Sequence, residues 1–177
     1  MKLLTHEQII KWYKELDTPD NIIDHVILVN KISNFLAKKL VEKGVEVNLE
    51  LVDASSLVHD LDKWLCVNDE KINHGFKTEE ILKEKGYPEL GYYARQHRGD
   101  LIVHGLKTWE EKIVFYADKR AQGDKIVSLQ ERFDYINKRY PAKDEKLRKK
   151  QIKLTFDLEK EIFDRLDIKP EDLANQF

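Results

Sequence analysis

Four polar residues stand inside apolar helical patterns of this chain: His25, His59, Asp60 and Asp118. His25 shares one helical stripe with Val29 and Leu36, which must face the core, so its imidazole is expected to point inward. Asp118 lies on a similar stripe with Val114. Buried imidazoles and carboxylates need partners, and one metal ion would pair all four side chains. The pattern therefore predicts a metal-dependent hydrolase of phosphate esters or anhydrides.

The four candidate ligands form a mixed set of nitrogen and oxygen donors. Such a set suits Mn, Fe(II), Co, Ni or Zn and suits Mg or Ca poorly. One or two of these ions would supply hydroxide near neutral pH and neutralise the phosphoryl oxygens, so no protein nucleophile is required. Each residue alone is a weak signal, because a lone inward histidine is more often a hydrogen-bonded core residue. The hypothesis rests on the joint pattern, in which three helices converge on one point.

Helices must position these residues, because apolar residues recur at helical spacing almost throughout the chain. Only seven glycines and four prolines interrupt the pattern. The expected helices cover about residues 5–16, 18–44, 48–65, 75–85, 88–97, 108–137 and 144–166. We therefore expect an all-α, single-domain helical bundle over residues 1–177, with a metal-site core at about 18–137 and a charged final helix at about 144–166.

The composition is that of an ordinary globular domain. The 177 residues suffice for one buried core, and 31 basic against 33 acidic residues create no global field that would recruit nucleic acid or anionic lipid. The single cysteine, Cys66, fits a reducing compartment, and no stretch is apolar enough for a secretion signal or a membrane span. We expect a cytoplasmic protein without a membrane or nucleic-acid partner. The lysine-rich stretch at 143–153 is interpreted as a solvated helix face.

The candidate ligands also resemble the motif of the HD-domain metal-dependent phosphohydrolases, which is named for a histidine, then His-Asp, then an aspartate. The resemblance runs from NIIDHVILVNKISNFLAKKL through LVHDLDKW to EEKIVFYADKRAQGDKIV and so covers most of the chain. Two further segments, HGFKTEEILKEKG with His74 and YARQHRGD with His97, resemble the branch that includes dinucleoside tetraphosphate hydrolases. Lys63, three residues after Asp60, resembles the HDxxK extension of the motif.

This resemblance implies roles for nine residues. One metal ion would be held by His25, His59, Asp60 and Asp118. A second ion would be held by His74 and His97, with Asp60 bridging the two ions and acting as the catalytic carboxylate. Gln96 stands where some two-metal relatives have another histidine, so either one or two divalent ions are expected. The motif places three cations close to the ligands as candidates for binding substrate phosphate, and these are Lys63, Arg98 and Arg120.

The expected reaction is hydrolysis of a phosphoester or phosphoanhydride, in a nucleotide or dinucleotide, with a metal-activated water as the nucleophile. Two alternatives share the same residues. One is a one-metal nucleoside monophosphate phosphatase, and the other is a catalytically silent module that binds a nucleotide as a signal. A third interpretation is a helical interaction protein whose histidines only form hydrogen bonds in the core. Metal content and product formation distinguish these alternatives.

Overall fold

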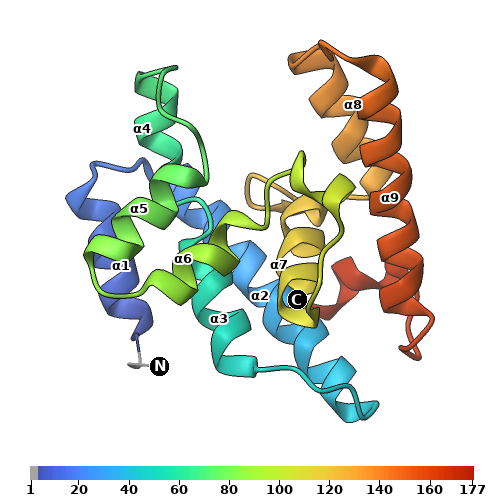
Figure 1. The fold of residues 1–177 in the computed structure, drawn as a ribbon. Helices are drawn as coiled ribbons and strands as arrows, with labels where there is room; N and C mark the ends of the chain where they lie inside the picture. The colour runs from blue at the N-terminus through green and yellow to red at the C-terminus, as the bar shows by residue number, and fades with distance from the viewer. Residues whose placement is uncertain (1–3) are drawn as a thin grey trace.

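The computed structural model describes residues 4–177, which fold into α-helices with one very small β-hairpin (Figure 1). The expected all-α fold is confirmed. In chain order the helices are α1 His6–Glu15, α2 Asp20–Glu42, α3 Leu49–Val58, α4 Lys63–Asn68, α5 Phe76–Glu84, α6 Pro88–Arg95, α7 Trp109–Arg120, α8 Leu129–Arg139 and α9 Glu145–Phe163. Two 3-10 helices cover Leu101–His104 and Pro170–Gln176, and two strands cover Ala121–Gln122 (β1) and Lys125–Ile126 (β2).

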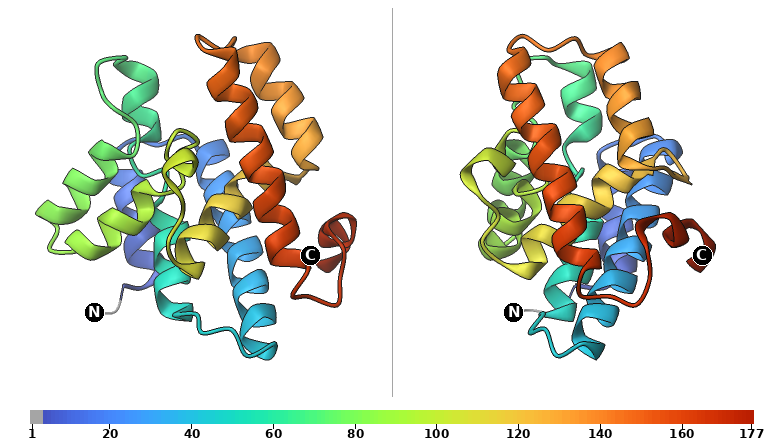
Figure 2. Two further views of the ribbon diagram at one scale, coloured as in Figure 1. Left: turned by 45° about the vertical axis from the view of Figure 1, so that its right-hand side comes forward. Right: turned by 90° about the vertical axis from the view of Figure 1, so that its right-hand side faces the viewer.

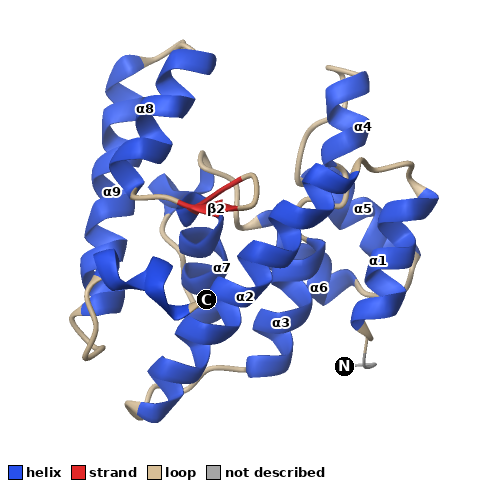
Figure 3. Cartoon of the chain, turned by 180° about the vertical axis from the view of Figure 1, so that it is seen from behind, coloured by secondary structure: helices blue, strands red, loops and turns tan. Residues whose placement is uncertain are grey.

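Helix α2 is the centre of the arrangement, because it packs against both α3 and α7. Helices α5 and α6 pack on each other, and α6 also lies against α3. On the opposite side, α8 and α9 run antiparallel and project as a helical hairpin beyond α7 (Figure 2). Seen from behind, α4 and this hairpin stand apart on the same side of the molecule (Figure 3).

Two hydrophobic clusters flank the middle of the molecule. The first, called here the α7-side core, includes Val29, Phe115 and Ile162. The second, called the α3-side core, includes Tyr13 and Leu57. Helix α2 contributes to both cores, because its N-terminal part packs on the α3 side and its C-terminal part on the α7 side.

The helix expected at about 48–65 ends earlier, at Val58, and α4 begins only at Lys63. The intervening turn is fixed from elsewhere in the chain. The Asp62 carboxylate accepts hydrogen bonds from the backbone N–H groups of Gly75 and Thr78, at 2.6 and 3.1 Å. These tertiary bonds outweigh the local helical pattern, which is why periodicity alone missed the break.

The long helix expected at about 108–137 is also wrong, because it is two helices joined by the β1–β2 hairpin. Gly123 occupies the turn of this hairpin with a positive φ of 60°, a conformation that glycine adopts without strain. Ser128 then starts α8 through a capping box with Glu131. The start of α7 is as expected, because Thr108 caps it by accepting a hydrogen bond from the backbone N–H of Glu111.

None of the helices formed by residues 4–177 has the length and apolar character needed to cross a membrane.

Candidate metal centre

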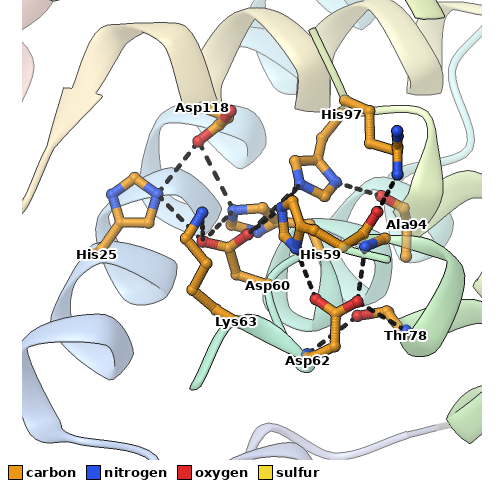
Figure 4. Close-up of polar contacts among 12 residues, drawn as sticks. His25, His59, Asp60, Asp62, Lys63, Thr78, Ala94, His97 and Asp118 are labelled. Carbon is orange, nitrogen blue, oxygen red and sulfur yellow. Dashed lines mark hydrogen bonds and ion pairs between the residues drawn. The ribbon is translucent and has the colours of Figure 1, made fainter. Parts of the chain in front are cut away.

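Three segments bring the four residues of the first predicted site together at the middle of the molecule (Figure 4). His25 comes from α2, His59 and Asp60 from the turn that follows α3, and Asp118 from α7. The Nε2 atom of His25 lies 3.2 Å from Oδ1 of Asp118, and Nε2 of His59 lies 3.8 Å from the same oxygen. All four side chains are buried, so their polar atoms face one another rather than solvent.

The two histidines of the second predicted site approach the same aspartate from the other side. The Nε2 atoms of His74 and His97 lie 3.2 and 3.4 Å from Oδ1 of Asp60. The other oxygen of Asp60, Oδ2, lies 3.9 Å from His25 Nε2 and 3.8 Å from His59 Nε2. Each carboxylate oxygen of Asp60 therefore serves a different pair of imidazoles, which is the geometry that a bridging ligand requires.

Hydrogen bonds at the outer ring nitrogens fix how the imidazoles are oriented. His59 Nδ1 lies 2.7 Å from the carbonyl oxygen of Ser56, and His97 Nδ1 lies 2.6 Å from that of Ala94. His74 Nδ1 lies 2.7 Å from Oδ1 of Asp62. Because these partners only accept, each Nδ1 carries a proton and donates it, which turns the Nε2 atom toward the centre.

The donor atoms at the centre fit a divalent transition metal. His59 Nε2 is buried and has no hydrogen-bond partner among the described residues, which is costly for a polar atom. The Nε2 atoms of His74 and His97 face each other at 2.9 Å, so a proton or a metal ion must lie between their lone pairs. Groups that could hold an ion include His25, His59 and Asp60, and also Asp60, His74 and His97. The mixed nitrogen and oxygen donors match the ions expected from the sequence.

Burial and charge shift the pKa values of these groups in opposite directions. Burial lowers the pKa of His59 to about 4, so this ring is neutral at pH 7. Burial also disfavours charge on His74, but hydrogen bonds that its ring donates to Asp60 and Asp62 outweigh this effect and raise the pKa of His74 to about 9. The pKa of Asp60 is held well below its usual value because the charge of Lys63 overcomes the effect of burial. The ionised carboxylate of Asp60 and the neutral ring of His59 thus face each other at the centre, as ligands of a divalent cation would.

Two residues that sequence reasoning missed hold the candidate ligands in place. Asp62 binds the His74 ring and the start of α5, and the only sequence signal was its position two residues after Asp60. The Lys119 ammonium group contacts the Asp118 carboxylate and donates to the carbonyl oxygen of His97 at 3.0 Å. Lys119 thereby links the two groups of ligands, although its sequence position beside Asp118 did not indicate this.

The three cations expected to bind substrate phosphate differ in position. Lys63 Nζ lies 3.7 Å from Asp60 Oδ2 and borders the cleft above the centre. Arg98 also borders the cleft, but its guanidinium is bound to Asp100 and to the backbone carbonyl oxygen of His74. It therefore fixes the loop that carries His74.

Arg120 is not brought to the site. Its guanidinium is buried on the other side of α7, where it donates to the hydroxyl of Tyr116, to Glu159 and to the carbonyl oxygen of Pro170. Successive residues on a helix point about 100° apart, so the side chain of Arg120 points away from those of Asp118 and Lys119 on α7. Its role is to tie α7 to α9 and the C-terminal segment, and the assignment to substrate binding was wrong.

A cleft of about 840 Å³ opens above the centre. Its floor includes His25, Asp60 and Asp118, and its walls come from α4 on one side and from α8 and α9 on the other. This volume lies within the range of pockets that hold nucleotide-sized ligands, roughly 300–1,000 Å³.

Comparison with known proteins gives three findings. A family model described as HD domain matches residues 22–134. An uncharacterized protein of Methanocaldococcus jannaschii is 33% identical over 134 residues, which cover 68% of this chain and 78% of that protein. A tRNA (cytidine(56)-2'-O)-methyltransferase of Picrophilus torridus is 30% identical over 147 residues, which cover 75% of this chain but only 41% of the methyltransferase. No solved structure gives a significant match.

Proposed function

Because the chain belongs to the HD-domain family, a superfamily of metal-dependent phosphohydrolases, we propose that it hydrolyses a phosphoester or phosphoanhydride bond of a nucleotide or dinucleotide, with water as the nucleophile. The observation that carries this proposal is the position of Asp60. Its carboxylate oxygens lie 3.2–3.9 Å from the Nε2 atoms of all four histidines of the two predicted sites. The described chain would work as one unit, since the ligands come from α2, α7 and the turns beside α3, α5 and α6.

We assign the metal ligands as two groups that share Asp60. One ion would be held by His25, His59, Asp60 and Asp118, and a second by Asp60, His74 and His97. When bound, divalent ions lower the pKa of a coordinated water and neutralise charge on the phosphoryl oxygens. The cofactor is thus one or two ions of Mn, Fe, Co, Ni or Zn.

The protein's own residues supply orientation and charge. Asp62 and Lys119 hold His74 and Asp118 in position, so the ligand geometry is set before substrate arrives. The charge of Asp60 raises the pKa of Lys63, which therefore stays cationic while it borders the cleft. We assign to Lys63 the binding of a phosphate oxygen beside the metal centre.

The cleft also supports a nucleotide as the substrate. Trp64 on α4 and Phe133 on α8 line it and offer apolar surface for a base. The relative from Picrophilus torridus, by its name, acts on tRNA, which agrees with a nucleotide-containing substrate for this type of domain.

Removal and restoration of metal test the proposal. We expect purified protein to hydrolyse p-nitrophenyl phosphate, to lose this activity after chelation, and to regain it with Mn or Co. Metal analysis would distinguish the two-ion assignment from a one-ion phosphatase, in which His97→Ala would leave the activity nearly intact. Metal-loaded protein that binds nucleotides without any turnover over hours would contradict hydrolysis and favour a silent binding module.

Metal uptake is expected to release a proton and to depend on pH. The pKa of His74 is about 9 without metal, so this ring is charged at pH 7 and must lose a proton before it can coordinate an ion. Binding to the second site should therefore strengthen about tenfold for each pH unit between pH 6 and 8. Calorimetry in buffers with different ionisation enthalpies would measure the proton release. His74→Ala is the matched variant and should release about one proton fewer; equal proton release in both proteins would contradict the assignment.

A further inference from the structure

The near-neutral net charge of the chain conceals a strongly basic segment at the tip of the α8–α9 hairpin. Between residues 138 and 153 there are eight lysines and arginines and only two acidic residues. Since the whole chain has a net charge of -2, the rest of the chain carries a net negative charge. Positive charge is therefore concentrated in this segment. The α8–α9 hairpin that carries it projects from the rest of the molecule (Figure 2).

The metal-site cleft extends along this hairpin. Its lining runs from Asp60 and His97 on the floor to Arg132 and Arg139 on α8 and to Arg148 on α9. None of these three arginines forms an ion pair with a carboxylate in the described part of the chain. Arg132 even has a buried Nε atom without a hydrogen-bond partner within residues 4–177. A row of guanidinium groups without carboxylate partners among the described residues, starting beside the candidate metal centre, indicates an anionic ligand longer than the reacting phosphate.

Aromatic side chains accompany these arginines along the cleft. Trp64 lines the α4 wall, whereas Tyr135 and Tyr140 line the hairpin wall and are 38% and 57% exposed. Exposed aromatic rings beside cations are the pattern by which proteins bind the bases and phosphates of single-stranded nucleic acids. Arg132 and Arg139 are seven residues apart on one helix, a rise of about 10 Å, so they are spaced to contact successive phosphates of one strand.

We propose that the cleft binds the end of a single-stranded oligonucleotide, with its terminal phosphate at the metal centre and its following nucleotides along α8 toward the hairpin tip. This proposal rests on the hydrolytic function proposed above. In the reaction a water oxygen bonds to the terminal phosphorus, and the ester bond from phosphorus to the ribose oxygen breaks. A proton from water ends on that ribose oxygen, and inorganic phosphate is released without any change of oxidation state.

A comparison of substrates tests the proposal with the metal-loaded protein. The substrates are a nucleoside monophosphate and a six-nucleotide single strand that carries its phosphate at the same end, and both 3'- and 5'-phosphates are tried. We expect kcat/KM to be at least tenfold higher for the better hexanucleotide, and to fall steeply with added salt because several phosphates are contacted. A hexanucleotide that reacts no faster than the mononucleotide would overturn the proposal.

Matched double variants show which charges cause the preference for the hexanucleotide. Arg139→Gln with Arg148→Gln removes two charges from the cleft wall and should lower the kcat/KM ratio of hexanucleotide to mononucleotide about tenfold. Lys149→Gln with Lys150→Gln removes two charges from the same hairpin outside the cleft lining and should leave the ratio within twofold. If the kcat/KM ratio fell equally in both double variants, the surface charge would act nonspecifically. That result would overturn the proposal that the strand lies along the cleft.

A binding measurement tests this proposal independently of the hydrolytic function. Fluorescence anisotropy of a labelled hexanucleotide measures affinity without turnover. If metal-loaded protein hydrolysed no phosphate ester at all, the proposed function would fail. The cleft assignment would still be supported by weaker binding in the Arg139 and Arg148 double variant than in the lysine pair, and refuted by equal binding.

Discussion

Substitution of Asp60 by asparagine is expected to lower kcat for phosphate ester hydrolysis by roughly 10³-fold or more, and to reduce the bound metal from two ions to one or none. Asparagine keeps the size of the side chain but removes its charge and leaves one oxygen instead of two. Since Oδ1 and Oδ2 of Asp60 face different pairs of histidines, both groups of ligands lose an anionic donor. Steady-state kinetics and elemental analysis of the purified variant measure the two effects.

A surface aspartate provides the matched control for this variant. Asp157→Asn removes the same charge from α9, where Asp157 pairs with exposed Lys153, so activity and metal content should stay near those of the wild type. Undiminished activity in the Asp60 variant would refute the assigned centre. Lost activity with full metal content would instead restrict Asp60 to a role in the reaction and remove it from the ligand set.

Chelation should lower the melting temperature by roughly 10 °C. An ion present at about 1,000 times its dissociation constant stabilises the folded state by about 4 kcal/mol, and a chain of this size shifts by about 2–4 °C per kcal/mol. Without metal, the buried His59 Nε2 has no hydrogen-bond partner within residues 4–177, although it lies beside the Asp60 and Asp118 carboxylates. Differential scanning calorimetry before chelation, after it, and after metal is restored measures the shift and its reversal.

The Asp60→Asn variant also serves as the control for this experiment, because chelation should shift its melting temperature far less than that of the wild type. If neither chelator nor added metal changed the melting temperature of the wild type, the result would favour the interpretation that the histidines only form hydrogen bonds within the core.

Local signals predicted most of the helices. Caps such as Thr5, Asn48 and Thr108 and the apolar stripe of α2 set the positions of α1, α2, α7 and the start of α3. The two errors have different causes. The turn after α3 is held by hydrogen bonds that the backbone N–H groups of Gly75 and Thr78 donate to Asp62, far along the chain. The β1–β2 hairpin, with Gly123 at its turn, interrupts a continuous helical pattern.

The candidate site was predictable to a different degree at each residue. The inward direction of His25 and Asp118 followed from their helical stripes, whereas His74 and His97 were expected only from the family resemblance. Lys119 and Arg120 show the limit of sequence adjacency. Both neighbour Asp118 in sequence, but Lys119 binds its carboxylate while Arg120 turns away to Glu159, and only the direction of each side chain in the fold distinguishes them.

The position of the ligands between the α7-side core and the α3-side core has a consequence for partial unfolding. Apolar residues of α2 belong to both cores, while the candidate ligands come from α2, α7 and the turn after α3. Separation of the two halves would therefore break metal coordination as well as the packing of α2 on α3 and α7, so a bound ion adds to the resistance. Metal supply in the cell would then govern how often the chain opens to proteases, and so its lifetime, as well as its catalytic rate.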